Sequence, residues 1–153
     1  MYRFTFLLIL LIASFSSVIS QSEPVSVYQN QRFGYINTKG ELIIKPQFKE
    51  GADFSEGLAR VRVGGLFGYI NIQGNTLIKP VYDYATDFTN GIAKVYKNGA
   101  PVFINKEGKE LFVAKGYEEG AISHNEKIII TKSKGKTGLY DLKTSKWLLP
   151  CTY

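Results

Sequence analysis

The sequence predicts an all-β protein in which tandem units of about 34 residues, each a three-stranded β-meander or hairpin repeat, stack into an open, elongated array. Residues 32–65 align with residues 66–99, and fifteen of the 34 aligned positions are identical. Within each unit the apolar residues alternate or form short runs, and Gly, Asn or Pro ends every run, which is typical of strands. No segment combines apolar residues at helical spacing with a capping signal, so we expect little helix.

Positions that recur in both complete units are expected to serve the fold, because each copy must meet the same surroundings. A single unit buries too little surface to fold alone, so neighbouring units must cover one another. Many recurring positions are aromatic, and we favour ladders of core rings over a set of ligand-stacking aromatics. The structural repeat residues are Phe33, Gly34, Asn37, Gly40, Pro46, Asp53, Phe54, Gly57, Phe67, Gly68, Asn71, Gly74, Pro80, Asp87, Phe88 and Gly91.

The first unit shows how strands and turns are expected to follow one another. Residues 33–36 form the first strand, and Asn37 stands three residues before Gly40, which predicts a type I turn with an Asn cap and a Gly at positive φ. The second strand, 42–44, is apolar throughout, so we expect it to be covered on both faces. Pro46 is expected to end this strand, because it cannot donate a ladder hydrogen bond.

The loop after the second strand carries an Asp-Phe pair at Asp53 and Phe54. We expect the ring to enter the core and the carboxylate to accept hydrogen bonds from backbone amides of the turn that ends at Gly57, and the pair at Asp87 repeats this before Gly91. Because the two aspartates recur at the repeat period, we favour this structural role over calcium ligation or a glycosidase carboxylate pair.

The third strand alternates small apolar residues with larger polar ones, so one face is expected in the core and the other in water. Stacking would gather the outward residues of successive units into one stripe. Arg binds carboxylates or sulfates with two donors, Tyr offers a flat face to sugar rings, and both are enriched at protein interfaces. An ordinary solvated sheet face is the alternative. The candidate binding face comprises Tyr28, Arg60, Arg62, Lys94 and Tyr96.

The N-terminal segment 1–20 has the features of a signal peptide. Arg3 precedes an apolar run at 6–13, small residues follow, and cleavage is expected before Gln21. The run is too short to cross a bilayer comfortably, although a retained membrane anchor is the alternative. We therefore expect a secreted or periplasmic protein with no stable membrane span after cleavage.

The remaining boundaries follow from the repeat. Residues 21–31 form an N-terminal half-unit that supplies a capping strand, residues 100–135 are a degenerate third unit, and residues 136–153 are a partial fourth. Half-units are common at the ends of repeat arrays. The stop at Tyr153 also fits a truncated product.

The sequence lacks the residues of common catalytic and metal sites. It has a single His124 and a single Cys151, with no Gly-rich phosphate loop or paired-Cys spacing, so we expect no enzyme, no metal and no cofactor. A lone Cys also excludes an intramolecular disulfide. The formal charge of +6 falls to +5 when Arg3 is removed with the leader. This mild charge favours anionic surfaces or glycans and does not point to nucleic acid.

An aromatic-Gly pair opens each complete unit, at 33–34 and 67–68, and is followed by aromatic-Ile-Asn, a Gly three residues on, Lys-Pro, and Gly-x-Ala-x-Val. This pattern resembles that of the WG-repeat family, also called KWG repeats. Phe stands where that family usually has Trp. The third and fourth units have 101–102 (Pro-Val) and 137–138 (Thr-Gly) in place of the pair, so we expect them to pack less regularly. The resemblance implies a β-hairpin repeat array, common in bacterial proteins, with an assumed role in interaction.

These features together predict a non-catalytic interaction module of an exported bacterial protein, with another protein as its partner. A carbohydrate-binding module for acidic envelope glycan is the alternative. A glycan-active enzyme is a distant third, which stays open because a glycosidase needs only two acids at a defined separation and the chain has 13 acidic residues.

Overall fold

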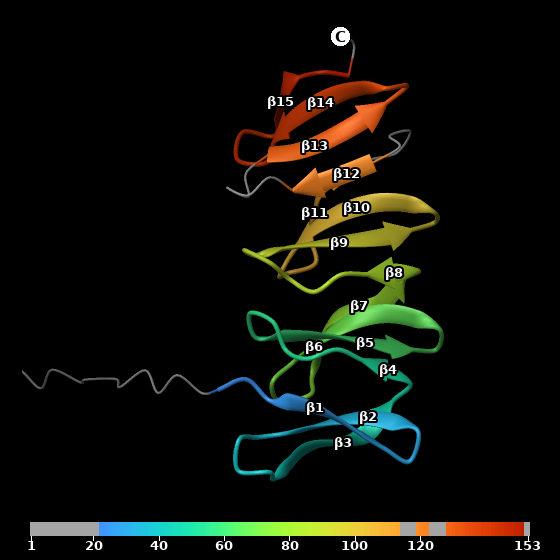
Figure 1. Cartoon of the computed structure of the whole chain (residues 1–153), viewed down its shortest axis with the longest axis vertical. Helices are drawn as coiled ribbons and strands as arrows, with labels where there is room; N and C mark the ends of the chain where they lie inside the picture. The colour runs from blue at the N-terminus through green and yellow to red at the C-terminus, as the bar shows by residue number, and fades with distance from the viewer. Residues whose placement is uncertain (1–21, 114–118, 123–127, 152–153) are drawn as a thin grey trace, which may run out of the picture.

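The chain folds into four small antiparallel sheets that stack along the long axis of the molecule (Figure 1). The computed structural model describes residues 22–113, 119–122 and 128–151. The predicted signal peptide, its cleavage site and His124 lie outside these residues. The described part of the chain contains no helix long and apolar enough to cross a membrane. The predicted all-β fold of tandem repeats is confirmed.

The first two sheets are built from the most regular part of the sequence. The first has the strand order β1-β2-β3, and the second has the order β4-β5-β6-β7. Their bounds are β1 Val25–Gln29, β2 Arg32–Ile36, β3 Leu42–Phe48, β4 Glu50–Gly51, β5 Leu58–Val63, β6 Leu66–Asn71 and β7 Thr76–Tyr82.

The third and fourth sheets repeat the four-stranded arrangement, with the orders β11-β10-β9-β8 and β12-β13-β14-β15. Their bounds are β8 Tyr84–Ala85, β9 Ile92–Lys97, β10 Ala100–Asn105, β11 Glu110–Val113, β12 Glu119–Ile122, β13 Ile128–Ser133, β14 Lys136–Asp141 and β15 Lys146–Leu149.

The sheets do not coincide with the sequence units, because each sheet contains the last strand of one unit and continues into the next unit. The hairpin of β5 and β6 joins the last strand of unit 32–65 to the first strand of unit 66–99, with Val63 opposite Leu66 at its tip. A two-residue strand, β4 or β8, pairs with the outer side of the hairpin, so these sheets have four strands where three were expected. Such strands are too short for a periodic pattern to reveal them.

The turn after the first strand of each unit forms as predicted. The side-chain oxygen of Asn37 accepts a hydrogen bond from the amide of Glu41 at 2.9 Å, and Gly40 has a φ of 80°. Asn71 and Asn105 accept the equivalent amide bonds one and two repeats later, at 2.9 and 2.8 Å. The Asn cap therefore fixes the same reversal in three successive sheets.

The expectation that Pro46 ends the second strand is wrong, because β3 continues two residues beyond it. Phe33 pairs with Phe48. Tyr35 pairs with Ile44. Two residues of β2 thus span four residues of β3, so β3 carries a bulge of two extra residues at this point. A proline is tolerated at such a bulge in an edge strand, where its missing N–H leaves no ladder bond unmade.

Gly34 is required at this bulge because the two backbones nearly touch. A Cβ on Gly34 would lie 2.6 Å from the carbonyl oxygen of Ile44 and 2.7 Å from the nitrogen of Pro46. Gly68 has the same surroundings, with the carbonyl oxygen of Ile78 at 2.5 Å. The glycine of the aromatic-Gly pair recurs because the bulged strand occupies the space in which a side chain would begin.

The third unit shows the ladder without this glycine. Val102 stands at the glycine position, and it pairs with Val113 directly beside the pair formed by Phe103 and Phe112. The ladder is regular at this point. The irregularity expected for the third unit therefore includes the loss of the bulge found in the first two units.

Both faces of the second sheet pack against a neighbouring sheet, so the expectation that one face of the third strand meets water holds only near the hairpin tip. Ala59 and Val61 of β5 belong to the core cluster shared with the first sheet. Tyr69, which is paired with Arg60, belongs to the cluster shared with the third sheet. The Arg60 and Arg62 side chains are only 30% and 35% exposed, because they lie at the margin of that second interface.

The second strand of each unit lies at an edge of its sheet, and the expectation that it is covered on both faces is also wrong. Ile44 is buried, but Leu42 and Ile43 are 50% and 44% exposed. Leu77 is 55% exposed beside the buried Ile78. Each of these two edge strands, β3 and β7, turns only one face toward a neighbouring sheet. A continuous apolar run does not show which of its faces is covered.

Aromatic rings pack against one another across the interfaces between sheets, as predicted. Tyr35 is fully buried, its ring lies 4.9 Å from that of Phe54 in the loop of the second sheet, and its hydroxyl donates a 2.8 Å hydrogen bond to the carbonyl of Ala52. Tyr69 and Phe88 repeat the ring contact at 4.8 Å between the second and third sheets.

The partners predicted for the recurring aspartates are wrong. The Asp53 carboxylate accepts a 2.9 Å hydrogen bond from the amide of Ser26 in the first sheet, and hydrogen bonds from Ser26 lower the pKa of Asp53. Asp87 instead accepts a 2.7 Å bond from Arg60 of the second sheet. Glutamates accept the bonds from the turn amides. The aspartates do join neighbouring sheets, but a single sequence does not show which sheet faces each loop.

Candidate interaction surface

Three residues of the predicted binding face occupy one repeated position near the hairpin tips. Tyr28, Arg62 and Tyr96 are spaced by the 34-residue period and lie on β1, β5 and β9. Tyr28 is paired with Phe33, and Arg62 is paired with Phe67, on the strand across the hairpin. The tips of these hairpins point to the same side of the stack (Figure 1).

A row of aromatic rings and one guanidinium follows this side. The rings of Tyr28 and Phe33 are 4.9 Å apart, and the Arg62 guanidinium lies 5.3 Å from the Phe67 ring centroid. The ring of Tyr84, on the short strand β8, lies 6.2 Å from that of Phe67 and 6.0 Å from that of Tyr96. We call this surface the aromatic stripe; it comprises Tyr28, Phe33, Arg62, Phe67, Tyr84 and Tyr96.

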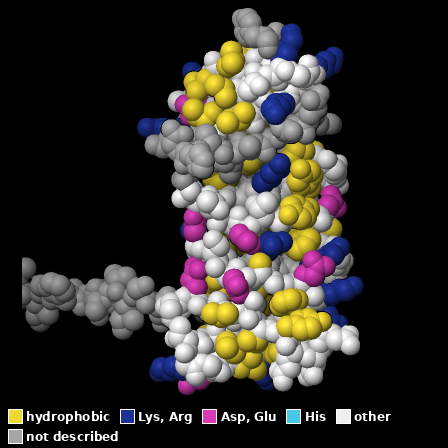
Figure 2. All heavy atoms as spheres, viewed as in Figure 1, with side chains coloured by type: hydrophobic (Ala, Val, Ile, Leu, Met, Phe, Trp, Pro, Cys, Tyr) yellow, Lys and Arg dark blue, Asp and Glu magenta, His cyan; other side chains and the backbone are white. Residues whose placement is uncertain are grey.

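The stripe is most open to solvent at two tyrosines. Tyr28 is 63% exposed and Tyr84 is 50% exposed, whereas Phe67 between them is buried. Hydrophobic side chains gather along the right-hand margin of the molecule in Figure 2, with charged side chains beside them. Exposed rings around a partly buried Arg have the composition that dominates the binding energy of protein interfaces.

Arg62 is held in a fixed position at the centre of the stripe. One of its terminal nitrogens donates a 2.5 Å hydrogen bond to Glu50, and its Nε donates a 2.8 Å bond to the carbonyl of Gly65. An Arg that is already ordered loses little side-chain freedom when a partner binds.

Two residues of the predicted face have other partners. Arg60 donates to the Asp87 carboxylate at 2.7 Å and to the carbonyl of Ala85 at 3.3 Å, so it links the second sheet to the third. The Lys94 ammonium lies 5.5 Å from the ring centroid of Tyr96. The structure thus places Lys94 at the end of the stripe and Arg60 in the interface beneath it.

A hollow of about 150 Å³ lies beside the stripe, where the first and second sheets meet. Its walls include two aromatic rings and one charged group of each sign, which suits the insertion of a side chain from a partner. The residues that line it are Phe33, Glu50, Gly51, Ala52, Arg60 and Phe67.

The sequence interpretation missed three residues of the stripe, Phe33, Phe67 and Tyr84, and one residue of the adjacent hollow, Glu50. Because Phe33 and Phe67 recur at the repeat period, their pattern predicts core positions and not a surface. Glu50 and Tyr84 occupy equivalent positions on the two-residue strands β4 and β8, for which no strand was predicted. The available signal was Tyr84 itself, an aromatic residue at a position that does not recur.

No group of three His, Cys, Asp or Glu side chains that could hold a metal ion occurs within the described ranges. Cys151 is partly buried, and its sulfur lies 3.2 Å from the Thr131 hydroxyl oxygen.

Stacked sheets of one repeating sequence, joined by the same side chains at successive interfaces, define a tandem β-repeat protein. The chain contains two adjacent WG-containing repeats, because the profile of that repeat matches residues 33–67 and 67–99. These matches cover the two units that retain both the aromatic-Gly pair and the bulge that requires its glycine.

Among solved structures, the chain is similar to "KlHsv2 with loop 6CD replaced by a Gly-Ser linker", with a TM-score of 0.55 and 11% sequence identity. The similarity covers 83% of this chain and 48% of that one, so the chain spans about half the length of the solved protein. At this identity the likeness supports the β-repeat fold alone. No curated protein matches the chain.

Proposed function

We propose that the chain is a non-catalytic interaction module that binds a partner protein through the aromatic stripe. The observation that carries the proposal is the position of Tyr84, which is half exposed and contacts both Phe67 of the second sheet and Tyr96 of the third. A surface that crosses sheet boundaries is broader than the face of one repeat, and Tyr and Arg are enriched among the residues that contribute most to protein binding.

Binding without turnover fits the chemistry of the stripe. Its polar groups, within the described residues, are phenol hydroxyls and a guanidinium paired with Glu50. Nucleophilic catalysis requires a nucleophile beside a base, and proton transfer requires a group that titrates near neutrality. The Arg62 guanidinium presents its N–H donors in a planar fork, which suits it to orient a ligand.

The proposal is tested with a stripe variant and a matched control. Cross-linking of the purified chain to envelope proteins, followed by mass spectrometry, identifies a partner whose affinity is then measured by titration. We expect the double substitution Tyr28→Ser with Tyr84→Ser to weaken binding at least about tenfold, since hot-spot residues contribute 2 kcal/mol or more. The control is Ile43→Ser with Leu77→Ser, which removes apolar side chains of similar exposure from the edge strands.

An equal effect of the two double substitutions would refute binding through the stripe. A glycan array run on the same proteins tests the second candidate, an acidic envelope glycan. The exposed ring of Tyr28 favours that candidate, since a flat apolar face can pack on a sugar ring. Stripe-dependent glycan binding without a protein partner would replace our proposal with this one. Glycan hydrolysis that is lost on Asp53→Asn would establish an enzyme instead.

Export through a cleaved leader is a separate part of the proposal. Cell fractionation should place the protein in the periplasm or the medium, and N-terminal sequencing should begin at Gln21. A chain that retains Met1 in the membrane fraction would show a retained anchor. This measurement does not depend on the identity of the partner.

A further inference from the structure

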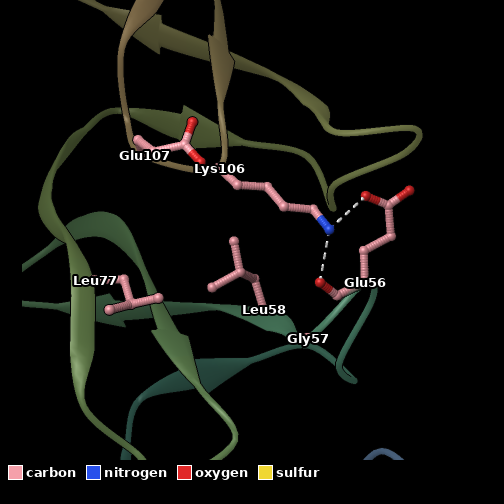
Figure 3. A pocket seen from close by; sticks show the side chains of 6 residues that line it. All are labelled: Glu56, Gly57, Leu58, Leu77, Lys106 and Glu107. Atoms are coloured by element: carbon pink, nitrogen blue, oxygen red, sulfur yellow. Dashed lines mark hydrogen bonds and ion pairs between the residues drawn. The ribbon is translucent and has the colours of Figure 1, made fainter. Parts of the chain in front are cut away.

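A second hollow opens between the second and third sheets, at the ends of the strands remote from the hairpin tips. Its volume is about 380 Å³, which lies within the range of small-molecule sites. Figure 3 shows two leucines on one side of it and the residues of the β10–β11 turn on the other. The lining residues are Glu56, Gly57, Leu58, Leu77, Lys106 and Glu107.

At this interface a lysine stands where the neighbouring repeats have an aliphatic residue. Lys106 stands at the repeat position of Ile72 and of Leu142, since the units are spaced by 34 and then 36 residues. Ile72 packs against the core cluster between the first and second sheets, and Leu142 packs against the cluster between the third and fourth. At the interface between them, a charged side chain occupies the position of an apolar one.

Lys106 extends across the hollow instead of filling it. Its ammonium donates a 2.9 Å hydrogen bond to the backbone carbonyl of Glu56 and lies 3.1 Å from the carboxylate of the same residue (Figure 3). That carboxylate also accepts hydrogen bonds from the amides of Asn90 and Gly91. Although desolvation opposes the shift, these bonds and Lys106 lower the pKa of Glu56, which favours its carboxylate form.

The hollow combines an apolar floor with an unbalanced negative charge. Leu58 is buried, and Leu77 is 55% exposed, which is a large apolar surface for one side chain to leave in water. The Lys106 and Glu56 charges offset one another. Within the described residues, Glu107 at the rim has no ion-pair partner, so it leaves the site with an excess of one carboxylate.

We propose that this hollow is a binding site for an aliphatic ammonium ligand, with the alkyl chain on Leu58 and Leu77 and the ammonium near the Glu107 carboxylate. The side chains of Ile72 and Leu142 show that an aliphatic group packs at this place in the neighbouring repeats. The site is separate from the aromatic stripe, and its test does not depend on the proposed partner.

Methyl NMR of the full exported chain tests the proposal, with hexylamine and hexanoate as probes of equal chain length and opposite charge. Hexylamine should shift the methyl signals of Leu58 and Leu77. It should bind about threefold to tenfold more tightly than hexanoate, because its ammonium is attracted to the exposed Glu107 carboxylate, whereas the hexanoate carboxylate is repelled by it. Equal affinities, absence of binding, or shifts confined to other residues would overturn the proposal.

Two substitutions separate the contributions of shape and charge. Lys106→Ile should restore the aliphatic plug of the neighbouring repeats and abolish the hexylamine shifts, and Glu107→Gln should remove the preference for hexylamine over hexanoate. Lys109→Ile, on the same turn but outside the lining, is the matched control and should bind like the parent. If Lys106→Ile fails to fold, Leu77→Ser at an exposed position must weaken hexylamine binding instead. Unchanged binding in every folded variant would refute the site.

Discussion

The hydroxyl of Tyr69 donates a 2.7 Å hydrogen bond to the carbonyl of Thr86, and this bond joins the second sheet to the loop of the third. Tyr35 and Ala52 make the same bond at 2.8 Å one repeat earlier. Phe103 stands at the next equivalent position and has no hydroxyl. Two successive interfaces therefore share a buried polar link that the following interface lacks.

Substitution of Tyr69 by Phe should reduce the free energy of unfolding by about 1 to 2 kcal/mol, because the Thr86 carbonyl then loses its buried donor. Urea denaturation followed by circular dichroism measures the loss. Tyr28→Phe is the control, because its ring is 63% exposed and its change should stay within about 0.5 kcal/mol of the parent. Equal losses for the two variants would contradict the role of this bond.

Alkaline pH should destabilise the protein through the same tyrosine. Burial raises the pKa of Tyr69 well above its ordinary value of 10.0, and the nearby Asp87 raises it further. Above pH 10 the unfolded chain therefore releases this proton while the folded protein keeps it, so the free energy of unfolding falls as pH rises. One such group contributes up to about 1.4 kcal/mol per pH unit.

Urea denaturation between pH 8 and pH 11 measures this slope. The decline should be shallower in Tyr69→Phe than in the parent, and stability at pH 8 should show only the loss of the hydrogen bond. A slope that is the same in both proteins would mean that Tyr69 does not carry the alkaline effect. The difference in tyrosinate absorbance between the parent and Tyr69→Phe at each pH provides an independent titration of the Tyr69 ring.

The period and the turn chemistry of the sequence were sufficient to predict the repeat fold. Asn37 and Gly40 specify their turn through local hydrogen bonds, and local rules apply to them directly. Pro46 was misinterpreted because the bulge beside it depends on a close approach to Gly34, which is twelve residues away. The covering of β3 and the partners of Asp53 depend on how one sheet stacks on the next, and a periodic pattern does not contain that information.

Glycine at position 68 should be close to irreplaceable. In Gly68→Ala the new Cβ would lie 2.5 Å from the carbonyl oxygen of Ile78 and 2.7 Å from the nitrogen of Pro80, and both contacts are with backbone that cannot turn aside. We expect a loss of about 3 kcal/mol or more, at the upper end of overpacking effects. Thermal unfolding followed by circular dichroism measures it.

Gly99→Ala provides a comparison with backbone strain alone. Gly99 has a φ of 74° and no atom within 4 Å of the position of a Cβ, so the cost should be about 1 to 2 kcal/mol. A smaller loss at Gly68 than at Gly99 would contradict the close-approach account. It would instead indicate that β7 can adopt the regular ladder that Val102 makes in the third sheet.

The candidate surface was predicted in part. Alternation placed Tyr28, Arg62 and Tyr96 on one side of their strands, and the repeat placed them in register. Arg60 follows the same alternation but contacts Asp87 in the interface, because solvent reaches only the tip end of that face. Tyr84 completes the stripe from a strand of two residues, whose existence depends on pairing with β9 and not on its own sequence.

Adjacent residues of β7 should respond very differently to truncation. Ile78 is 5% exposed and belongs to the core between the second and third sheets, whereas Leu77 is 55% exposed on the opposite face. Ile78→Ala should therefore reduce the free energy of unfolding by about 2 to 5 kcal/mol. Leu77→Ala should change it by less than about 0.5 kcal/mol, because it leaves no cavity. Urea denaturation of the two variants under identical conditions makes the comparison. Similar losses at both positions would mean that the outer face of β7 is also buried. That result would support the expectation that this strand is covered on both faces.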